Sequence, residues 1–492
     1  MPLQKNQVLT LRVERLSSDG SGVAHSPDGE TVFIPGAAPG DEARVRIVKD
    51  CKRYAFGILD EVLTPSPDRI PVDCAVAGPC GGCSLRHLDY AAELRAKQEN
   101  VADAFARIGG LDVPVLPIVG SPEVNRYRNK VQFPVGVDKS GKPCIGFYAG
   151  RTHRIVPCPD CRLQPGVLNE IGNALCAFFA EKGIQPYSEE TGRGLVRHIF
   201  LRRGAHSGQI MVCLVCTRAK LPSAEELCTR LKAQFAEITT ILLNVNAKNT
   251  NVILGTETHT LYGQGYIEDT LCGVPVQLGP LSFYQVNTLA AEQLYGIAAQ
   301  YAQLTPDDLL LDLYCGMGTI GLSMAAHCRE LIGVEIVPEA IESAKANAAR
   351  MGADVAAKSR FFCADAGQAA TRLAAEGLHP DIVMLDPPRK GCDEATLSAV
   401  VRMSPRRVVY VSCNPATAAR DAAWLEQNGY HAEKVQPVDL FPRTRHCEAV
   451  LLLTKLHVER HIEVDVSMDE LDVTAAESKA ATPKPRPSKR KG

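Results

Sequence analysis

The second half of the chain alternates apolar runs with alanine-rich stretches, and this alternation limits the fold more than any other feature. The five runs are LLLDLYCG (309–316), ELIGVE (330–335), DIVMLDPP (381–388), RVVYVSC (407–413) and EAVLLLTKL (448–456). Short apolar runs of this kind are typical of buried strands, and the stretches between them have the composition of helices. We therefore expect an α/β domain over residues 271–456, built as a doubly wound parallel sheet.

A glycine-rich loop follows the first of these runs. Gly316, Gly318 and Gly321 lie between a strand and a helix in LLLDLYCGMGTIGL, and Glu335 ends the next strand. Glycines let a backbone approach a ligand, and a carboxylate at this place can accept hydrogen bonds from two ribose hydroxyls. NAD and S-adenosylmethionine both need a close backbone and an acceptor for the ribose hydroxyls, so the loop does not distinguish them. Glycines also occur in strand-to-helix turns that bind no ligand. The loop alone predicts a nucleoside-containing cofactor and leaves its identity open.

Two further strands end in reactive side chains. Asp386 and Arg389 follow one strand in LDPPRKG, and Cys413 ends another in VSCNPAT. The carboxyl ends of parallel strands meet at one edge of a sheet, where open α/β sheets bind ligands. A cysteine inside a strand is usually inert packing, but Asn414 and Pro415 turn the chain directly after this one. We expect Cys413 to face the same crevice as the cofactor loop.

A cysteine at such a place suits methyl transfer to carbon. C5 of uracil is too weak a nucleophile to attack a methyl sulfonium unaided, whereas addition of a thiolate at C6 makes an enolate that shares its charge with C5. A base must then remove the surplus C5 proton, and Glu448 in RHCEAVLLL begins the last strand of the domain. In isolation Glu448 reads as an ordinary strand-edge residue. Its coincidence with Asp386 and Cys413 at neighbouring strand ends favours a catalytic role.

The rest of the chain divides into three parts. With 492 residues and 45% hydrophobic content the chain is long enough for two or three domains. Alternating segments over residues 1–63 predict a small OB-like, antiparallel β-barrel, and such barrels commonly bind oligonucleotides. Residues 64–270 predict a mixed α+β central domain with a helix over 88–110, and residues 457–492 predict a disordered tail.

The sequence also predicts where in the cell the protein is found. The N-terminus does not resemble a signal peptide, and no apolar run reaches the roughly 18 residues of a membrane span, so we expect a cytoplasmic protein. Its 18 cysteines should then be mostly unpaired. A net charge of −2 neither supports nor excludes a nucleic-acid partner.

Three cysteines form a cluster with the spacing of metal ligands. Cys74, Cys80 and Cys83 follow a C-x5-C-x2-C pattern in DCAVAGPCGGCSL. A fourth ligand is available in VPCPDCRLQ, either Cys158 or Cys161. Zinc and iron–sulfur clusters both accept four cysteines, and the spacing does not separate them.

Two basic segments are candidate RNA contacts. One is NRYRNKVQF and the other is GLVRHIFLRRG, and their charged residues are Arg126, Arg128, Lys130, Arg197, His198, Arg202 and Arg203. Charges on alternate strand positions ordinarily form a solvated face. Beside a uracil-modifying site and an OB-like barrel, phosphate contact becomes the better interpretation.

Five motifs in order, FYQVNT, LDLYCGMGTIGL, LDPPRKG, SCNPATAARD and FPRTRHCEAV, resemble those of the RNA 5-methyluridine methyltransferases that use S-adenosylmethionine. The resemblance covers nearly the whole chain except the tail. It implies a class I (Rossmann-like) methyltransferase domain and a TRAM barrel, with Cys413 adding to uracil C6 and Glu448 removing the C5 proton. The cofactor residues that it implies are Gln285, Tyr314, Gly316, Gly318, Thr319, Glu335, Asp365 and Asp386. Cys447 departs from the family pattern, which usually has valine there.

The same resemblance bears on the cysteines and on the substrate. The CGGCSLRH element and the cysteine before RLQ look like the [4Fe-4S] site of the ribosomal RNA members, which implies Cys74, Cys80, Cys83 and Cys161 as ligands. It favours 23S ribosomal RNA as the substrate, with the target uracil flipped out of its stack. We expect a monomer that has RNA as its partner and no membrane association.

Three different functions also stay open on the sequence. The first is methylation of the transfer RNA T-loop. The second is that of an RNA-binding scaffold that has lost catalysis. The third is that of an NAD-dependent oxidoreductase, which would leave Cys413 and Glu448 without a role.

Overall fold

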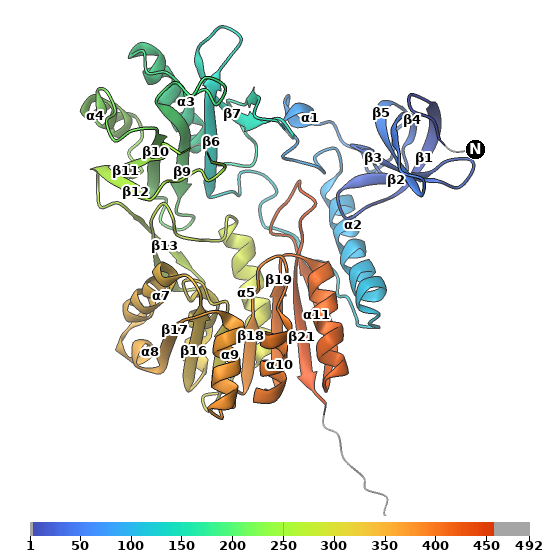
Figure 1. Ribbon diagram of the computed structural model, residues 1–492, viewed down its shortest axis with the longest axis vertical. Helices are drawn as coiled ribbons and strands as arrows, with labels where there is room; N and C mark the ends of the chain where they lie inside the picture. The colour runs from blue at the N-terminus through green and yellow to red at the C-terminus, as the bar shows by residue number, and fades with distance from the viewer. Residues whose placement is uncertain (1–2, 151, 249, 457–492) are drawn as a thin grey trace, which may run out of the picture. The chain divides into compact units, whose positions relative to one another are not determined.

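The computed structural model describes residues 3–150, 152–248 and 250–456 (Figure 1). The tail predicted over 457–492 lies outside these residues. The chain up to Lys455 forms one compact unit.

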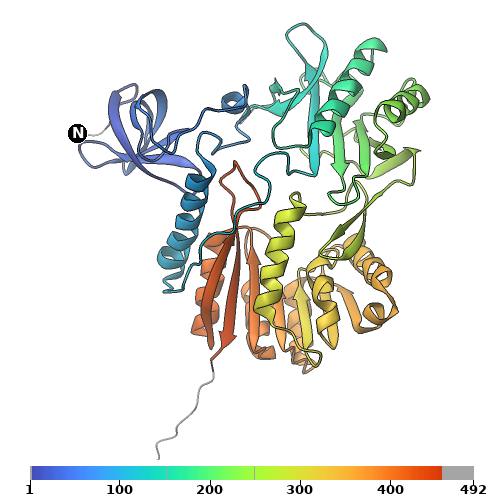
Figure 2. The same cartoon turned by 180° about the vertical axis from the view of Figure 1, so that it is seen from behind.

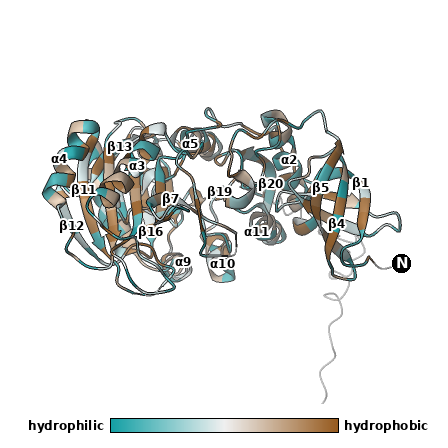
Figure 3. Ribbon diagram, turned by 90° about the horizontal axis from the view of Figure 1, so that it is seen from above, coloured by the Kyte–Doolittle hydropathy of each residue, from teal (hydrophilic) through white to brown (hydrophobic). Residues whose placement is uncertain are grey.

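The N-terminal residues form a closed barrel. Its strands are β1 (Val8–Leu16), β2 (Ser21–His25), β3 (Thr31–Pro35), β4 (Glu42–Asp50) and β5 (Tyr54–Thr64), in the order β1-β2-β3-β5-β4. Buried and exposed residues alternate along β4, and hydrophobic and hydrophilic colours alternate along the barrel strands in Figure 3. The sequence predicted a wholly antiparallel barrel, and this prediction is wrong for one strand pair. The long strand β5 pairs with β4 antiparallel and also with β3 parallel, and this second pairing closes the barrel.

A helical segment follows the barrel. The short α1 (Ala77–Cys80) precedes α2 (Tyr90–Asp103), whose N-cap Asp89 accepts a hydrogen bond from the Ala92 amide. A π-helical turn, η1 (Ala104–Gly109), continues α2 until Gly110 ends it with a positive φ of 64°.

A second sheet of seven strands lies at the centre of the chain, in the order β12-β11-β10-β9-β6-β7-β8. The strands are β6 (Lys130–Val137), β7 (Pro143–Tyr148), β8 (Ile155–Pro157), β9 (Val196–Arg203), β10 (Ile210–Cys216), β11 (Ile238–Val245) and β12 (Glu257–Tyr262). Helices α3 (Gly166–Glu181) and α4 (Ala224–Gln234) pack their apolar sides onto it. The hairpin of β13 (Ile267–Leu271) and β14 (Val274–Leu278) leads to the last part of the chain.

The third sheet has the strand order β17-β16-β15-β18-β19-β21-β20. Its strands are β15 (Leu309–Leu313), β16 (Glu330–Glu335), β17 (Ser359–Cys363), β18 (Ile382–Leu385), β19 (Arg407–Ser412), β20 (Tyr430–Val438) and β21 (Glu448–Lys455). Its helices are α5 (Thr288–Ala302), α6 (Thr319–Met324) with the 3-10 turn η2 (Ala325–His327), α7 (Pro338–Met351), α8 (Ala353–Lys358), α9 (Ala366–Ala375), α10 (Glu394–Met403) and α11 (Pro415–Gln427).

Helices cover both faces of this sheet. Leu309, Leu311 and Leu313 of β15 pack in one core with α9, α10 and α11, which lie in front of the sheet in Figure 1. Leu310, which points to the opposite side, packs in the other core with α5, α6 and α7, and α5 faces the viewer in Figure 2. The doubly wound α/β fold expected from the sequence is confirmed.

One strand breaks the expected parallel order. The pairs among β15, β16, β17, β18 and β19 are parallel, but β21 is antiparallel to both β19 and β20. The connection from β20 to β21 is a loop without a crossover helix, and a parallel pair would need such a crossover. As a result β21 begins at the edge where its neighbours end.

Candidate functional site

A large cavity lies at the carboxyl edge of the third sheet. Cys413 follows the last residue of β19, and Glu448 is the first residue of the antiparallel β21. Ser412 pairs with Ala449, so the two reactive residues lie beside each other on adjacent strands. The cavity has a volume of about 1390 Å³ and is lined by both of them together with Asp386. The strand reversal is therefore what brings a residue from the end of the chain to this edge.

Seven of the eight predicted cofactor residues line this cavity, namely Gln285, Tyr314, Gly316, Thr319, Glu335, Asp365 and Asp386. Gly318 does not. It has a φ of 79° as the N-cap of α6, and a Cβ there would lie 3.1 Å from Leu322. Its absent side chain allows the turn and its packing.

The glycine loop is held by the acidic residue of the next strand. The Glu335 carboxylate accepts hydrogen bonds from the Gly316 amide at 3.2 Å and from the Val337 amide at 3.0 Å. Tyr314, with a positive φ of 65°, turns the chain out of β15 into the loop. The arrangement keeps one carboxylate at the cavity wall beside exposed backbone.

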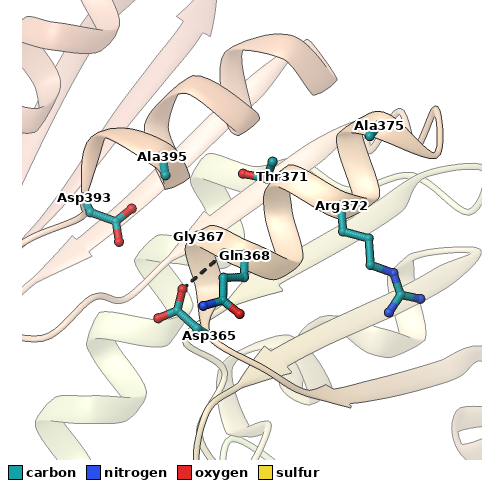
Figure 4. A pocket seen from close by; sticks show the side chains of 8 residues that line it. All are labelled: Asp365, Gly367, Gln368, Thr371, Arg372, Ala375, Asp393 and Ala395. Carbon is teal, nitrogen blue, oxygen red and sulfur yellow. Dashed lines mark hydrogen bonds between the residues drawn. The ribbon is translucent and has the colours of Figure 1, made fainter.

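Asp365 lies between this cavity and a smaller one. Its side chain accepts a hydrogen bond from the Gln368 amide and caps α9, as the dashed line in Figure 4 marks. The smaller cavity, of about 450 Å³, runs along α9 toward Arg372 and also contacts Asp393. Asp365 and Asp393 line both cavities.

Three acidic groups share the reactive part of the large cavity. Burial raises the pKa of Asp386 to about 7. Burial and the nearby Asp386 raise the pKa of Glu448 to about 8, although Arg389 opposes the shift. Burial, followed by the charges of Glu448 and Asp386, also raises the pKa of the Cys413 thiol. Burial and mutual repulsion thus disfavour ionisation of all three groups together.

Arg389 is the cation that opposes these shifts. It lowers the pKa of Cys413 both by its charge and by a hydrogen bond to the thiol. Its guanidinium donates to Nδ1 of His446 at 2.9 Å, and its backbone carbonyl accepts from the Asn414 side chain at 3.0 Å. The Asp386–Arg389 turn is therefore attached to the turn that carries Cys413. Both residues stand in motifs of the sequence, LDPPRKG and FPRTRHCEAV, but the sequence alone did not predict this contact or a catalytic role for either residue.

The loop between β20 and β21 is organised by helix α2. Lys97 Nζ donates to Asp439 at 2.7 Å and to Glu93 at 2.8 Å, and all three side chains are at most 1% exposed. Tyr90 donates to the other oxygen of Asp439, and Glu93 accepts from the Arg443 amide at 2.7 Å. The loop that leads to His446 and Glu448 thus depends on residues far from it in the sequence.

The cysteines expected to hold a metal lie in two segments of the chain. Burial raises the pKa of Cys80, and the thiolate charges of Cys161 and Cys74 add to the shift, so these thiols influence one another electrostatically. Cys158 donates a hydrogen bond to Cys161, which lowers the pKa of Cys161 to about 7. Cys158 itself is buried, whereas Cys161 is partly exposed. Among the described residues, no group of three or more His, Cys, Asp or Glu side chains is arranged so that it could hold a metal ion.

The donor set nevertheless suits a soft metal centre. Every described cysteine is a free thiol, and thiolates that raise one another's pKa gain from a shared cation. Cys161, whose pKa is lowered, also receives hydrogen bonds from the amides of Leu163 and Gln164.

The structure separates the basic residues into two groups. Arg126 donates to the carbonyls of Cys161 and Gln164, and Arg197 donates to the carbonyls of Asn246 and Lys248. These arginines hold loops. Burial lowers the pKa of His198 to about 4, which leaves it neutral.

A second group of basic residues meets the large cavity. Arg128 and Lys130 line it, and Arg202 of β9 is the strand partner of Lys130. Arg203, at the end of β9, is partly exposed and lies outside the described lining of the cavity.

Comparison with known proteins gives consistent matches. Residues 205–456 match the family described as tRNA (Uracil-5-)-methyltransferase, and residues 2–59 match the TRAM domain. An uncharacterized RNA methyltransferase of Halalkalibacterium halodurans is 43% identical over 453 residues, which are 92% of this chain and 98% of the relative. One from Listeria monocytogenes is 42% identical over 455 residues, with the same coverage.

A solved structure is similar over most of the chain. It is that of a Pyrococcus abyssi tRNA (uracil-54, C5)-methyltransferase in complex with S-adenosyl-L-homocysteine. The TM-score is 0.72 and the identity 26%, over 91% of this chain and all of that chain. In the described part of the chain, no helix is long and apolar enough to span a bilayer.

Proposed function

Because the chain belongs to the RNA uracil-5-methyltransferase family that carries a TRAM domain, we propose that it methylates C5 of uracil in RNA through a covalent adduct with Cys413. The methyl donor is S-adenosylmethionine, and the reaction takes place in the cytoplasm on 23S ribosomal RNA. The single observation that carries the proposal is that Cys413, Glu448 and the glycine loop line the same cavity. The division of the chain into a barrel (1–63), a central domain (64–270), a methyltransferase domain (271–456) and a tail (457–492) is part of the same proposal.

The cofactor site is the part of the cavity nearest the glycine loop. Glu335 is placed to accept hydrogen bonds from ribose hydroxyls, and Gly316 leaves the backbone open beside it. Gln285, Tyr314, Thr319 and Asp365 complete the wall. S-adenosylmethionine, when bound, supplies an electrophilic methyl group.

Cys413 begins the chemistry. Its thiolate adds to C6 of the uracil, and the electron pair of the C5–C6 bond moves into an enolate that makes C5 nucleophilic. Arg389 favours the thiolate because it donates a hydrogen bond to the sulfur and carries the opposite charge. C5 then takes the methyl group, and the sulfonium leaves as a neutral thioether.

Glu448 ends the reaction. Its carboxylate takes the proton from C5, the electrons of that C–H bond re-form the C5–C6 double bond, and the thiolate of Cys413 leaves C6. A pKa near 8 makes Glu448 a stronger base than a solvated carboxylate. Asp386, with its pKa raised to about 7, can donate or accept a hydrogen bond at the uracil edge as its proton shifts.

We further propose a [4Fe-4S] cluster held by Cys74, Cys80, Cys83 and Cys161. The grouping of these thiols and the low pKa of Cys161 support it. Methyl transfer moves no net electrons, so the role of the cluster is to hold the segment around Cys80 against the segment around Cys161.

A second candidate substrate is the T-loop of transfer RNA. The likeness to the Pyrococcus abyssi enzyme, whose description names uracil 54 of tRNA, favours it. The cysteine motif favours 23S ribosomal RNA. Mapping 5-methyluridine in both RNAs from a strain that lacks this protein separates the two, because only the true substrate loses the modification.

RNA that contains 5-fluorouracil tests the covalent mechanism. Fluorine at C5 cannot be removed as a proton, so the wild-type protein should remain attached to the RNA on a denaturing gel when S-adenosylmethionine is present. Cys413→Ala should form no adduct. Cys363→Ala, at an exposed thiol, is the control and should behave as wild type. Adduct formation by Cys413→Ala would refute the mechanism.

The result for the wild-type protein in this experiment also shows whether it is an enzyme or an RNA-binding scaffold. A scaffold without catalytic function would form no adduct with the fluorinated RNA. An NAD-dependent oxidoreductase is separated by titration calorimetry, in which it would bind NAD and show no affinity for S-adenosylmethionine.

A further inference from the structure

Two cations face each other across neighbouring strands beside the cavity. Lys130 of β6 is the direct partner of Arg202 of β9 in an antiparallel pair. Like charges in this position destabilise a sheet, and the cost grows when water is removed. Arg202 is 1% exposed and Lys130 is partly buried. The fold therefore bears a repulsion that an apolar residue at position 130 would remove.

These charges lack an acidic partner within the part of the chain that the structure describes, where neither Arg128, Lys130 nor Arg202 forms an ion pair. Arg202 donates to the carbonyls of Gly279 and Ser282, at 2.8 and 2.7 Å, and its Nε has no partner among the described residues. The Nε of Arg128 is likewise buried and unpartnered there. Burial, together with the charges of Arg202 and Arg128, lowers the pKa of Lys130 to about 8, so that its amine still carries a proton at neutral pH.

The position of these cations is fixed relative to the cofactor wall. Asn129, between Arg128 and Lys130, donates from its side chain to the Gln285 carbonyl at 2.7 Å and from its amide to the Val286 carbonyl at 2.8 Å. Arg128 and Lys130 both line the cavity, and Arg128 is near enough to His446 to lower the pKa of that ring. The cations thus line the same cavity as Gln285 of the cofactor wall and His446 of the reactive part.

The size of the cavity indicates what the cations meet. Its volume of about 1390 Å³ exceeds the range of roughly 300 to 1,000 Å³ of a single small-ligand pocket. A flipped nucleotide enters such a site with its phosphate attached, and Phe283, 71% exposed on the cavity wall, offers an adjacent surface for a base. An anion is therefore delivered with the substrate.

We propose that Arg128 and Lys130, backed by Arg202, form a binding site for an RNA phosphate next to the target uracil. The proposal rests on the proposed function, since it identifies the anion as part of that substrate. The repulsion between Lys130 and Arg202 is relieved only when the phosphate arrives, so the site favours RNA over uncharged ligands. The one competing anion of the same chemistry is the carboxylate of the cofactor's methionine group.

Salt dependence of RNA binding tests the site. The probe is a fluorescent single-stranded oligoribonucleotide that contains uracil, bound to the full-length protein at several salt concentrations. Lys130→Met should weaken binding several-fold at low salt and make the plot of log affinity against log salt shallower by roughly 0.7 to 1. Lys139→Met, at an exposed lysine in the β6–β7 turn, should leave both the affinity and the slope unchanged.

Two further measurements identify the anion and exclude misfolding. Affinity for S-adenosylmethionine without RNA should be the same in Lys130→Met and wild type, and the melting temperature of the variant should be equal or higher because a repulsion is gone. Loss of cofactor affinity with an unchanged salt slope would assign the cations to the cofactor and overturn the proposal. A lower melting temperature would overturn it by showing a structural lysine.

The outcome is distinguishable from failure of the proposed function. If wild-type protein bound RNA with the expected salt slope and Lys130→Met reduced it, while no 5-methyluridine were formed, the phosphate site would stand and the methylation proposal would fall.

Discussion

The guanidinium of Arg389 donates a hydrogen bond to Nδ1 of His446 at 2.9 Å, and this contact joins the loop that follows β18 to the loop that precedes β21, across the end of β19. Burial and the charge of Arg389 lower the pKa of His446 to about 4, so the ring is neutral and can accept. Because the same arginine lowers the pKa of Cys413, the orientation of His446 bears on the reactivity of the thiol.

Replacement of Arg389 by methionine should make Cys413 less reactive. Without the cation, the charges of Glu448 and Asp386 act unopposed, and the pKa of the thiol rises. We expect the pH midpoint for alkylation of Cys413, followed by mass spectrometry of its peptide, to move up. Arg360→Met, at an exposed pair with Glu330, is the control and should not move it. An unchanged midpoint in Arg389→Met would contradict the assignment.

Methylation should become faster as pH rises from about 6 to 9. Glu448 acts as a base only when ionised, and its pKa of about 8 places that step within this range. The raised pKa of Cys413 acts in the same direction, because the thiolate is the reactive form. The measurement is single-turnover methylation of a uracil-containing RNA at each pH. A rate independent of pH would mean that neither group titrates in the rate-limiting step.

Glu448→Gln should stabilise the protein at alkaline pH while it stops turnover. The folded pKa of about 8 lies above the usual value of 4.5, so the folded state holds a proton that the unfolded state has lost. Stability therefore falls as pH rises from about 4.5 to 8, and glutamine, which carries no charge, avoids this loss. The gain should reach up to ~4 kcal/mol at pH 8 and vanish near pH 4.

Denaturant unfolding of wild type and Glu448→Gln at both pH values measures this difference. Glu433→Gln, at an exposed position on β20, serves as the control. If the free energies of unfolding of wild type and Glu448→Gln were equal at pH 8, ionisation of Glu448 would not destabilise the folded protein, and the prediction would be wrong.

Much of the site follows from where polar residues stand in the sequence. Gly316, Asp386 and Cys413 each follow an apolar run, and the carboxyl ends of parallel strands share an edge, so their meeting is a consequence of the pattern. Glu448 stands instead before its run. It reaches the same edge because β21 is antiparallel, and that reversal depends on the connection between β20 and β21.

Other features could not be predicted because their partners are distant in the sequence. Glu93 and Lys97 stand four residues apart on a helix, a spacing typical of an exposed ion pair, yet both are buried against Asp439. The strand β20, YHAEKVQPV, alternates polar and apolar residues and was not among the expected runs. Gly318 matches a cofactor motif, but its position shows a packing role.

Lys97→Met should destabilise the protein and slow catalysis together. Removal of the lysine leaves Asp439 buried without its cation and leaves Glu93 with Arg443 alone, 3.6 Å away, at a cost of about 3 to 5 kcal/mol. The loop before Glu448 loses its anchor, so the rate of methylation should fall even where the variant is fully folded. Lys345→Met, at an exposed pair with Glu342, should cost less than about 0.5 kcal/mol. Wild-type rates in folded Lys97→Met would show that the network serves stability alone.

The choice between Cys161 and Cys158 can be made with the metal itself. Protein purified without oxygen should contain about four iron and four sulfide per chain and absorb visible light. Cys161→Ser should lose iron and colour. Cys158→Ser should keep them, because the serine hydroxyl can still donate a hydrogen bond to Cys161. Retention of the cluster in Cys161→Ser and its loss in Cys158→Ser would make Cys158 the fourth ligand in place of Cys161. If the wild-type protein and both variants contained zinc and no iron, the site would be a mononuclear zinc site and the proposed cluster would be wrong.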